Sequence, residues 1–197
     1  MIKELLLGTT NPAKINHYQR FLKEFNIKIL TPGEVGVTDS PPEQGDTLEA
    51  NAAQKAEYYH KQTGLPTLAD DAGFEIPALK NFPGVHSRRF AGHEMDDREI
   101  IETILKRMEN LNGPDRQARM RVVLALVIPG EGVKLASGSI TGTVPRQPYG
   151  KLEPSFPYRS LLFVSSLNKW FYEVTETEEE QLGYRKAALN KLKKYFT

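Results

Sequence analysis

The sequence of 197 residues contains no cysteine, and this absence excludes disulfide bonds, zinc–thiolate sites and thiol nucleophiles. Long apolar runs are also missing, because the longest, Val122 to Ile128, is far too short to span a bilayer. Residues 1 to 7 show no signal-peptide pattern. We therefore expect a cytoplasmic protein that does not associate with membranes.

An excess of charge of one sign is missing too. The chain carries 26 basic and 25 acidic residues, for a net charge of +1, so it lacks the electrostatic surface that binds duplex nucleic acid. No linker rich in proline, glycine and serine divides the sequence, and its length is enough for one domain with a sizeable core. We expect a single domain over residues 1–197.

The N-terminal segment predicts a strand, a turn and a helix. Leu5-Leu6-Leu7 is typical of a buried strand, and Asn11 and Pro12 suit the N-cap and the first position of a helix. The start of such a helix favours an anion, although neither a P-loop nor a dinucleotide fingerprint is present. Taken alone, the lysine one turn into this helix is more typical of an ordinary exposed helix residue. The side chains expected to contact the anion are Thr9, Thr10, Asn11 and Lys14.

Two adjacent carboxylates, Asp70 and Asp71, follow an apolar run that predicts a strand over residues 65–69. The end of a strand would place them at the carboxyl edge of a sheet, where α/β proteins bind ligands. Magnesium binds through one or two carboxylates together with the phosphates of a substrate. A solvated turn is the alternative, because Asp-Asp before Ala-Gly is common in turns. This segment alone leaves both interpretations open.

The remaining patterns alternate between helix and strand and predict an α/β fold with a mixed sheet. Asp46 with Glu49, and Asp96 with Glu99, form capping-box patterns that open two helices. The expected elements are a strand over 28–30, a loop over 39–46, a helix to about 62, a helix from 97, an antiparallel pair over 119–128 and 133–144, strands over 159–164 and 171–174, and a helix over 178–195.

Short blocks along nearly the whole chain match those of a known family in order and spacing. They are LLLGTTNPAK at the N-terminus, TLEANAAQKA at 47–56, LADDAGFEIPAL at 68–79, FPGVHSRRFAG at 82–92 and GSITGTVPR at 138–146. The sequence thereby resembles the Ham1/RdgB group of inosine triphosphate pyrophosphatases, which hydrolyse non-standard purine nucleoside triphosphates such as ITP, dITP and XTP. This resemblance implies a two-lobed ITPase-like fold, with a central mixed twisted sheet and a groove between the lobes, and a homodimer.

The resemblance also implies the chemistry, which is Mg²⁺-dependent cleavage between the α- and β-phosphates to a nucleoside monophosphate and pyrophosphate. Asp71 matches the catalytic aspartate of the family, which activates water or binds the metal, and Asp70 supports it. Lys14 and Lys55 match lysines that hold phosphates, with the threonines and Asn11 as a cradle. Lys55 on its own would be a solvated helix residue.

One departure from the family concerns the second metal ligand. The glutamate that usually precedes the asparagine of the second block is replaced by Ala50, and Glu49 lies one residue earlier. One position on a regular helix is about 100° of rotation. Glu49 is therefore either a shifted metal ligand or only the capping-box partner of Asp46, and we expect Asp71 and Glu49 to form the metal site.

A second departure concerns the part that contacts the base. The family's Phe-Gly-Tyr-Asp is Phe156-Pro157-Tyr158-Arg159 here, and its Ser-His-Arg is Gly183-Tyr184-Arg185. We place Phe156, Tyr158, Arg159 and Arg185 among the substrate-binding residues. Arginine in place of aspartate presents donors instead of an acceptor, which predicts a preference for 6-keto purines such as ITP, XTP or GTP over ATP. In the alternative, Arg159 faces solvent.

Two function classes follow from these observations. The intact phosphate and Asp-Asp blocks favour a magnesium-dependent nucleoside triphosphate pyrophosphatase with altered base preference. The displaced glutamate favours the alternative, a non-catalytic nucleotide-binding or regulatory protein derived from such an enzyme. Pyrophosphate release in the presence of magnesium separates the two.

Overall fold

The computed structural model describes residues 2–42, 44–88, 90–154 and 156–196. The chain divides into two compact units, each assembled from separate segments. Unit 1 consists of the chain up to Ala72, the segment Val122–Gly138 and the chain from Tyr184 onward. Unit 2 consists of Gly73–Arg121 and Ser139–Gly183. The two units are described separately below.

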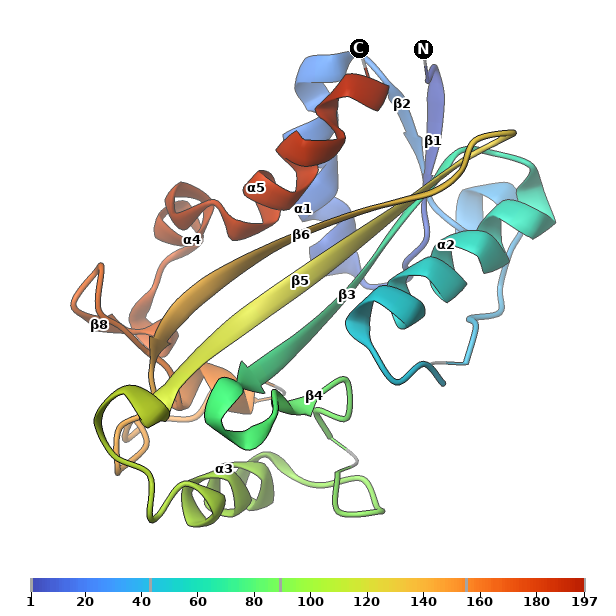
Figure 1. Ribbon diagram of the computed structural model, residues 1–197. Coiled ribbons are helices and arrows are strands. Elements are labelled where there is room, and N and C mark those ends of the chain that lie inside the picture. Colours follow the sequence, from blue (N-terminus) through green and yellow to red (C-terminus); the bar gives the residue numbers. More distant parts are fainter. Residues whose placement is uncertain (1, 43, 89, 155, 197) are drawn as a thin grey trace. The chain divides into compact units, whose positions relative to one another are not determined.

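The strands follow the hydrogen-bonded order β2-β1-β3-β5-β6-β7-β8, and β4 pairs with β3. Pairing is parallel for β1 with β2 and β3, and antiparallel for β3 with β4, β6 with β7 and β7 with β8. The predicted α/β class with a mixed sheet is therefore confirmed (Figure 1). The strands are β1 Glu4–Leu7, β2 Lys28–Leu30, β3 Thr67–Ile76, β4 Phe82–Gly84, β5 Gln117–Ile128, β6 Gly132–Thr143, β7 Phe163–Val164 and β8 Lys169–Trp170.

Unit 1 contains the helices α1 (Pro12–Leu22), α2 (Leu48–Thr63) and α5 (Tyr184–Leu192). The three leucines of β1 are fully buried, as expected for a central parallel strand. The segments that follow α1 and α5 are in contact, because the ring centroids of Phe25 and Phe196 are 5.4 Å apart. Three 3₁₀ turns complete this unit, at Lys23–Phe25, Gly33–Val35 and Lys193–Tyr195.

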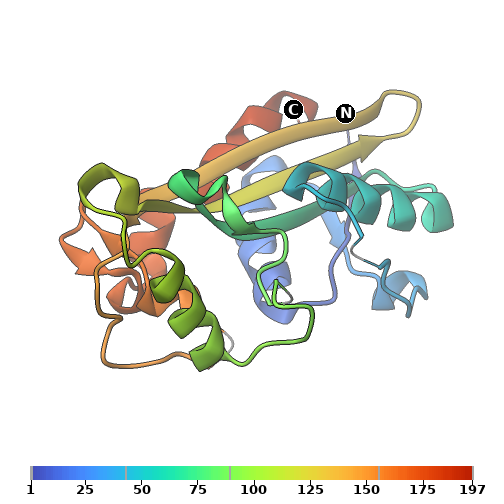
Figure 2. The same cartoon turned by 60° about the horizontal axis from the view of Figure 1, so that its bottom comes forward.

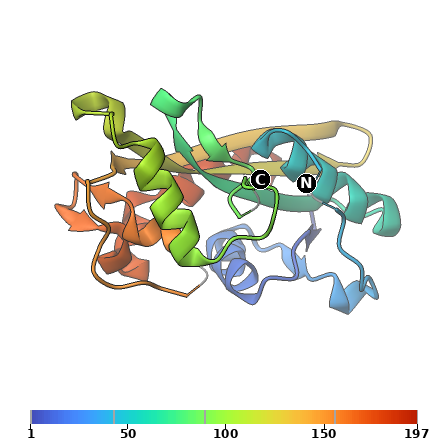
Figure 3. The same ribbon diagram turned by 90° about the horizontal axis from the view of Figure 1, so that it is seen from below.

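Unit 2 contains α3 (Asp97–Arg107) and α4 (Glu176–Leu182). α3 begins at the predicted N-cap, since the Asp96 side chain accepts a hydrogen bond from the Glu99 N–H at 2.9 Å. The helix packs beside the 3₁₀ turn Pro157–Ser160, as Figures 2 and 3 show from two sides. The other 3₁₀ turns of the unit are Pro77–Leu79, Gly113–Arg116 and Phe171–Glu173.

Two predicted boundaries are wrong in the N-terminal half. The strand expected to stop at Ala69 continues to Ile76 as β3, because its later residues Phe74–Ile76 pair with β4. The N-cap of α2 is Thr47 and not Asp46, since the Thr47 hydroxyl accepts from the Ala50 N–H at 3.1 Å. Threonine caps a helix nearly as well as aspartate, so the capping box predicted for Asp46 and Glu49 does not form.

The C-terminal region also differs from the prediction. The strand expected over 159–164 is a 3₁₀ turn followed by the short β7, and most of that expected over 171–174 is a 3₁₀ turn after β8. The long helix expected over 178–195 is broken at Gly183, which ends α4 in the left-handed region at φ 66°. Glycine tolerates this conformation and favours a helix end. No described helix is long and apolar enough to cross a membrane.

Candidate active site

Asp70 and Asp71 lie within β3 and are almost fully buried, with 2% and 8% of their surfaces exposed. The predicted turn and the predicted strand end at Ala69 are therefore both wrong. The neighbouring strand β1 stops at Leu7, which pairs with Leu68. The two aspartates consequently lie just beyond the carboxyl end of β1. We expected them at the carboxyl end of their own strand, but it is the neighbouring strand that ends beside them.

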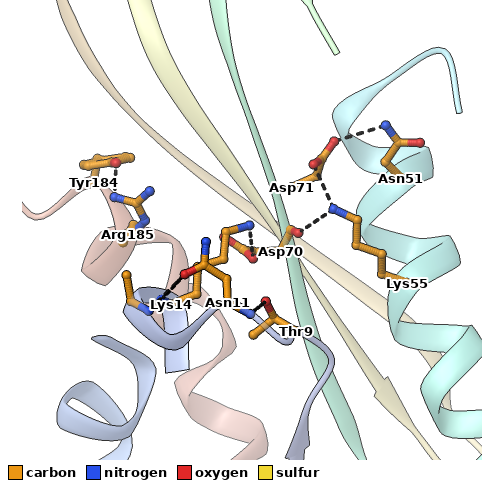
Figure 4. Close-up of polar contacts among 10 residues, drawn as sticks. Thr9, Asn11, Lys14, Asn51, Lys55, Asp70, Asp71, Tyr184 and Arg185 are labelled. Carbon is orange, nitrogen blue, oxygen red and sulfur yellow. Dashed lines mark hydrogen bonds and ion pairs between the residues drawn. The ribbon is translucent and has the colours of Figure 1, made fainter. Parts of the chain in front are cut away.

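The two carboxylates point in opposite directions, because consecutive residues of a strand face opposite sides of a sheet. Asp70 Oδ1 accepts from Lys14 Nζ on α1 at 2.8 Å. Asp71 Oδ1 accepts from Lys55 Nζ on α2 at 3.0 Å. Figure 4 shows the two lysines reaching β3 from opposite sides. Each predicted phosphate lysine thus forms an ion pair with one predicted catalytic aspartate.

The Asp71 carboxylate is held by a second residue of α2. Asn51 Nδ2 donates to Asp71 Oδ2 at 3.2 Å, and Asn51 Oδ1 accepts from the Gly45 N–H at 2.7 Å. Lys55 also donates to the backbone oxygen of Asp70 at 3.3 Å. Sequence reasoning missed Asn51, although its spacing of four residues from Lys55 places both on one helix face.

The environment of Asp70 keeps it ionised. Burial would raise its pKa, but the charge and hydrogen bond of Lys14, with further charges from Arg185 and Lys55, hold the pKa below its usual value. Tyr18, one turn after Lys14, is buried beside this carboxylate. Burial and the charge of Asp70 together raise the pKa of Tyr18 well above its usual value, so its phenol stays protonated.

The turn between β1 and α1 uses its polar groups to cap the helix. The Asn11 side chain accepts from the N–H groups of Ala13 at 2.9 Å and Lys14 at 3.3 Å. The Thr9 hydroxyl accepts from the Asn11 N–H at 3.2 Å, while Thr10 is exposed. We expected open backbone N–H groups here. The cap occupies two of them, those of Ala13 and Lys14.

Arg185 is the third cation near the aspartates. Its charge contributes to the lowered pKa of Asp70 and offsets part of the rise in the pKa of Tyr18. Its guanidinium carbon lies 4.6 Å from the centre of the Tyr184 ring. Figure 4 shows Tyr184 and Arg185 on the same side of β3 as Lys14. Arg185 belongs to unit 1, as do Lys14 and Lys55.

The other predicted base-binding residues belong to unit 2. Phe156 is half exposed, with 52% of its surface open to solvent. Tyr158 is buried, its ring stacks on Phe74 with centroids 4.8 Å apart, and its hydroxyl donates to the Ser87 carbonyl. Phe156 thus stays accessible for stacking on a base, whereas Tyr158 already has an aromatic partner within the protein.

Arg159 makes contacts within unit 2 that we did not anticipate, two of them hydrogen bonds and one an ion pair. Nε lies 2.9 Å from Glu153, one terminal nitrogen donates to Glu179 at 3.1 Å, and the other donates to the Val174 carbonyl at 2.8 Å. The guanidinium carbon also lies 4.4 Å from the centre of the Phe171 ring. Arg159 therefore does not face solvent, contrary to the alternative expectation, because only 18% of its side chain is exposed. Its expected contact with the base stays a prediction.

Glu49 lies in the first turn of α2 and lines a hollow of about 220 Å³ together with Val123, Ser137 and Lys191. Among the described residues, no group of three or more histidine, cysteine, aspartate or glutamate side chains is placed to hold a metal. Glu49, Asp70 and Asp71 therefore do not form a three-carboxylate metal group among the described residues. A magnesium ion fits this donor set through the carboxylate of Asp71 and the phosphates of a substrate.

The fold and these ion pairs define an α/β protein whose buried carboxylates are paired with lysines beyond the end of a parallel strand. The sequence model of the Ham1 family matches residues 5–195, and the chain belongs to this family. A dITP/XTP pyrophosphatase of Bacillus subtilis is 34% identical over 194 residues, which is 98% of this chain and 97% of that protein.

A further relative and two solved structures are also similar to this chain. A dITP/XTP pyrophosphatase of Thermus thermophilus is 36% identical over 189 residues, covering 96% of this chain and 89% of that protein. A solved structure of a HAM1 protein from Coxiella burnetii is similar with a TM-score of 0.84 at 34% identity, over 98% of this chain and 96% of the other. The structure of the Staphylococcus aureus Ham1 protein is similar with a TM-score of 0.83 at 28% identity. The match covers 98% of this chain and 97% of that one.

Proposed function

We propose that this protein hydrolyses non-standard purine nucleoside triphosphates, of the dITP and XTP type, to a nucleoside monophosphate and pyrophosphate. The observation that supports this most is the pairing of Lys14 with Asp70 and of Lys55 with Asp71 in one unit of a Ham1-family chain. The names of its relatives agree with this substrate class. The chemistry of the site supports an enzyme over a non-catalytic binding protein.

The lysines are the phosphate-binding groups in this proposal. A triphosphate carries several negative charges and competes with the two carboxylates for the ammonium groups of Lys14 and Lys55. Charged hydrogen bonds from ammonium to phosphate oxygen are strong, so the lysines can shift from the aspartates to the substrate. This exchange would leave the aspartates free to act on the water and the metal.

Asp71 is the proposed proton acceptor. It is more exposed than Asp70, and Asn51 fixes its orientation. In the reaction, water attacks the α-phosphorus, the bond from the α-phosphorus to the bridging oxygen breaks, and pyrophosphate leaves with the bonding electrons. The attacking water loses its proton to Asp71. Asp70, which is ionised and buried, pairs with Lys14 before the substrate binds.

Magnesium is part of this proposal. When bound, Mg²⁺ neutralises charge that develops on the phosphate oxygens during such a transfer. Asp71 is the residue that would hold it, with the substrate supplying further oxygens. We also propose that the protein acts as a homodimer in the cytoplasm, as the family resemblance suggests.

The decisive experiment measures pyrophosphate release from dITP, XTP, dGTP and ATP by the purified protein, with magnesium and with excess chelator. We expect turnover of dITP and XTP only with magnesium, at a kcat/KM well above that for ATP. Lys14→Gln and Lys55→Gln should raise KM, and Lys61→Gln, an exposed lysine on α2, is the matched control. Absence of pyrophosphate release from every triphosphate would refute the proposed function.

A further inference from the structure

Tyr184 and Arg185 are neighbours in the chain, yet their side chains are in contact. The Arg185 guanidinium carbon lies 4.6 Å from the centre of the Tyr184 ring, and an Arg185 terminal nitrogen donates to the Tyr184 hydroxyl. Adjacent residues on a helix point about 100° apart and do not normally face each other. This contact therefore depends on where Tyr184 is fixed by its surroundings.

Tyr184 is fixed at the start of α5 by its burial and by its backbone. Only 3% of its surface is exposed. Its carbonyl oxygen lies against Gly138 of β6, so closely that a Cβ atom at position 138 would be 1.9 Å from that oxygen. Glycine at 138 thus allows the first turn of α5 to pack directly on the strand, with the Tyr184 side chain buried.

Arg185, in contrast, is partly exposed and has a long side chain that loses considerable entropy when it is held in one position. Stacking on the Tyr184 ring and a hydrogen bond to its hydroxyl together restrict the plane of the guanidinium. The charge held there acts on Asp70 and Tyr18. Tyr184 thus orients the N–H donors of the Arg185 guanidinium. They lie on the side of β3 that carries the Lys14–Asp70 pair (Figure 4).

We propose that Tyr184 is a positioning residue, which holds the Arg185 guanidinium in the orientation that contacts acceptor oxygens of the bound nucleotide. The inference rests on the proposed function, because it takes the nucleotide as the ligand of Arg185. The Tyr184 side chain acts only through Arg185 and does not itself touch the substrate. Its contribution is pre-organisation, which strengthens binding by reducing the entropy lost when Arg185 meets its ligand.

The test is a double-mutant cycle with Tyr184→Phe and Arg185→Ala, followed by steady-state kinetics with dITP. Tyr184→Phe keeps the ring and removes the oxygen that accepts from Arg185, so KM should rise about tenfold with little change in kcat. Arg185→Ala should raise KM by about 100-fold. In the Arg185→Ala protein, adding Tyr184→Phe should change nothing further, because the group through which Tyr184 acts is gone.

Two further variants separate positioning from packing. Tyr195→Phe removes a hydroxyl at the other end of the same region, where Lys194 Nζ lies 5.0 Å from the ring centre, and should leave KM unchanged. Tyr184→His, which keeps a ring and a nitrogen that can accept a hydrogen bond, should recover most of the affinity lost in Tyr184→Phe. Thermal unfolding of all variants shows whether any effect on KM is a loss of fold.

A second readout does not depend on turnover. The N–H signals of the Arg185 guanidinium, identified in NMR spectra by their loss in Arg185→Ala, should show restricted rotation in the wild-type protein and faster rotation in Tyr184→Phe. Equal losses from Tyr184→Phe with and without Arg185, or unchanged rotation, would overturn the positioning role. A wild-type protein without pyrophosphate release would refute the proposed function, while the NMR comparison would still decide on the contact.

Discussion

The acidic pair of unit 1 and the arginine cluster of unit 2 both consist of buried or half-buried charges, but their balance is opposite. In unit 1 three cations, Lys14, Lys55 and Arg185, act on the two carboxylates of β3. In unit 2 the single cation Arg159 meets two carboxylates, Glu153 and Glu179. Among these described contacts, cations outnumber carboxylates in the first cluster, and carboxylates outnumber the cation in the second.

This difference agrees with the proposal that the first cluster binds an anion, whereas Arg159 is held by partners within the protein. A surplus cation in a polar site favours the arrival of an anion, since the ligand completes the charge balance. A surplus carboxylate instead keeps an arginine occupied, and Arg159 further binds a backbone carbonyl and stacks on Phe171. The presence of an arginine in a sequence block that resembles a base-binding motif is therefore insufficient to assign it to the base, because its partners decide its role.

The strongest test of unit 1 is Asp71→Asn. The amide keeps the shape of the carboxylate but cannot accept a proton or balance a metal, so kcat for dITP should fall about 1000-fold. Fold and nucleotide binding should be retained, since the cations are untouched. The measurement is pyrophosphate release together with nucleotide binding by calorimetry, with the exposed Asp39→Asn as the control. Turnover like that of the wild type would remove Asp71 from the mechanism.

Asp70→Asn tests the buried ion pair through stability. Removing one partner of such a pair leaves Lys14 without its counter-charge, and the free energy of unfolding should drop by about 2–4 kcal/mol at neutral pH. The pKa of Asp70 is lowered in the folded protein, so its stabilisation is complete above the usual aspartate pKa of about 3.9. The stabilisation is lost as the pH falls through the folded-state pKa.

Urea unfolding of the wild type and Asp70→Asn across a pH series measures this dependence. The difference in unfolding free energy between the two proteins should stay constant above about pH 5 and shrink on further acidification. A difference that grows with acidification would show that Asp70 is not stabilised in its ionised form.

Gly138→Ala tests the close packing of α5 on β6. The added methyl group would meet the Tyr184 carbonyl at 1.9 Å, so the first turn of the helix must move, with an expected loss of about 1–3 kcal/mol in stability. Because Tyr184 orients Arg185, KM for dITP should rise as well. Gly150→Ala is the control, since a Cβ atom there meets nothing within 4 Å. Equal melting temperatures for the two variants would contradict the close contact between Gly138 and the Tyr184 carbonyl.

Arg159→Ala tests whether unit 2 reads the base through this arginine. The structure predicts a loss of about 1 kcal/mol in stability, because Arg159 is partly buried in a small ion-pair cluster. The ratio of kcat/KM for dITP to that for ATP should stay the same, contrary to the selectivity change that the sequence pattern suggests. Arg159→Lys keeps the charge and serves as the comparison. A changed ratio of kcat/KM for dITP to that for ATP would show that Arg159 takes part in base recognition.

The smallest effect is expected at Glu49. Its place in the first turn of α2, beside Ser137 and Lys191, implies a change of no more than about 1 kcal/mol in stability for Glu49→Gln. The magnesium concentration required for half-maximal activity should remain that of the wild type, as it should for Glu57→Gln on the same helix. A sharply raised magnesium requirement would make Glu49 a metal ligand and add a third acid to the cluster in unit 1.

Local signals in the sequence identify several elements and most of the residues of the candidate site. Asn11 caps α1, Asp96 caps α3, and the leucines of β1 are buried as their pattern predicts. These features depend on contacts within a few residues, or on the burial of one apolar segment, so the order of residues is enough to predict them. The match to an ordered set of family blocks also predicts the α/β class with a mixed sheet.

Tertiary structure alone decides where the polar groups find partners. Asp70 and Asp71 are strand residues because β1 and β4 pair with the same strand, and a sequence window of Asp-Asp-Ala-Gly cannot contain that information. Arg159 is bound by Glu153, Val174 and Glu179, and these partners are brought together only by the fold. The energy of a charged side chain depends on its neighbours in space and on its burial, so its role is fixed only when the chain has folded.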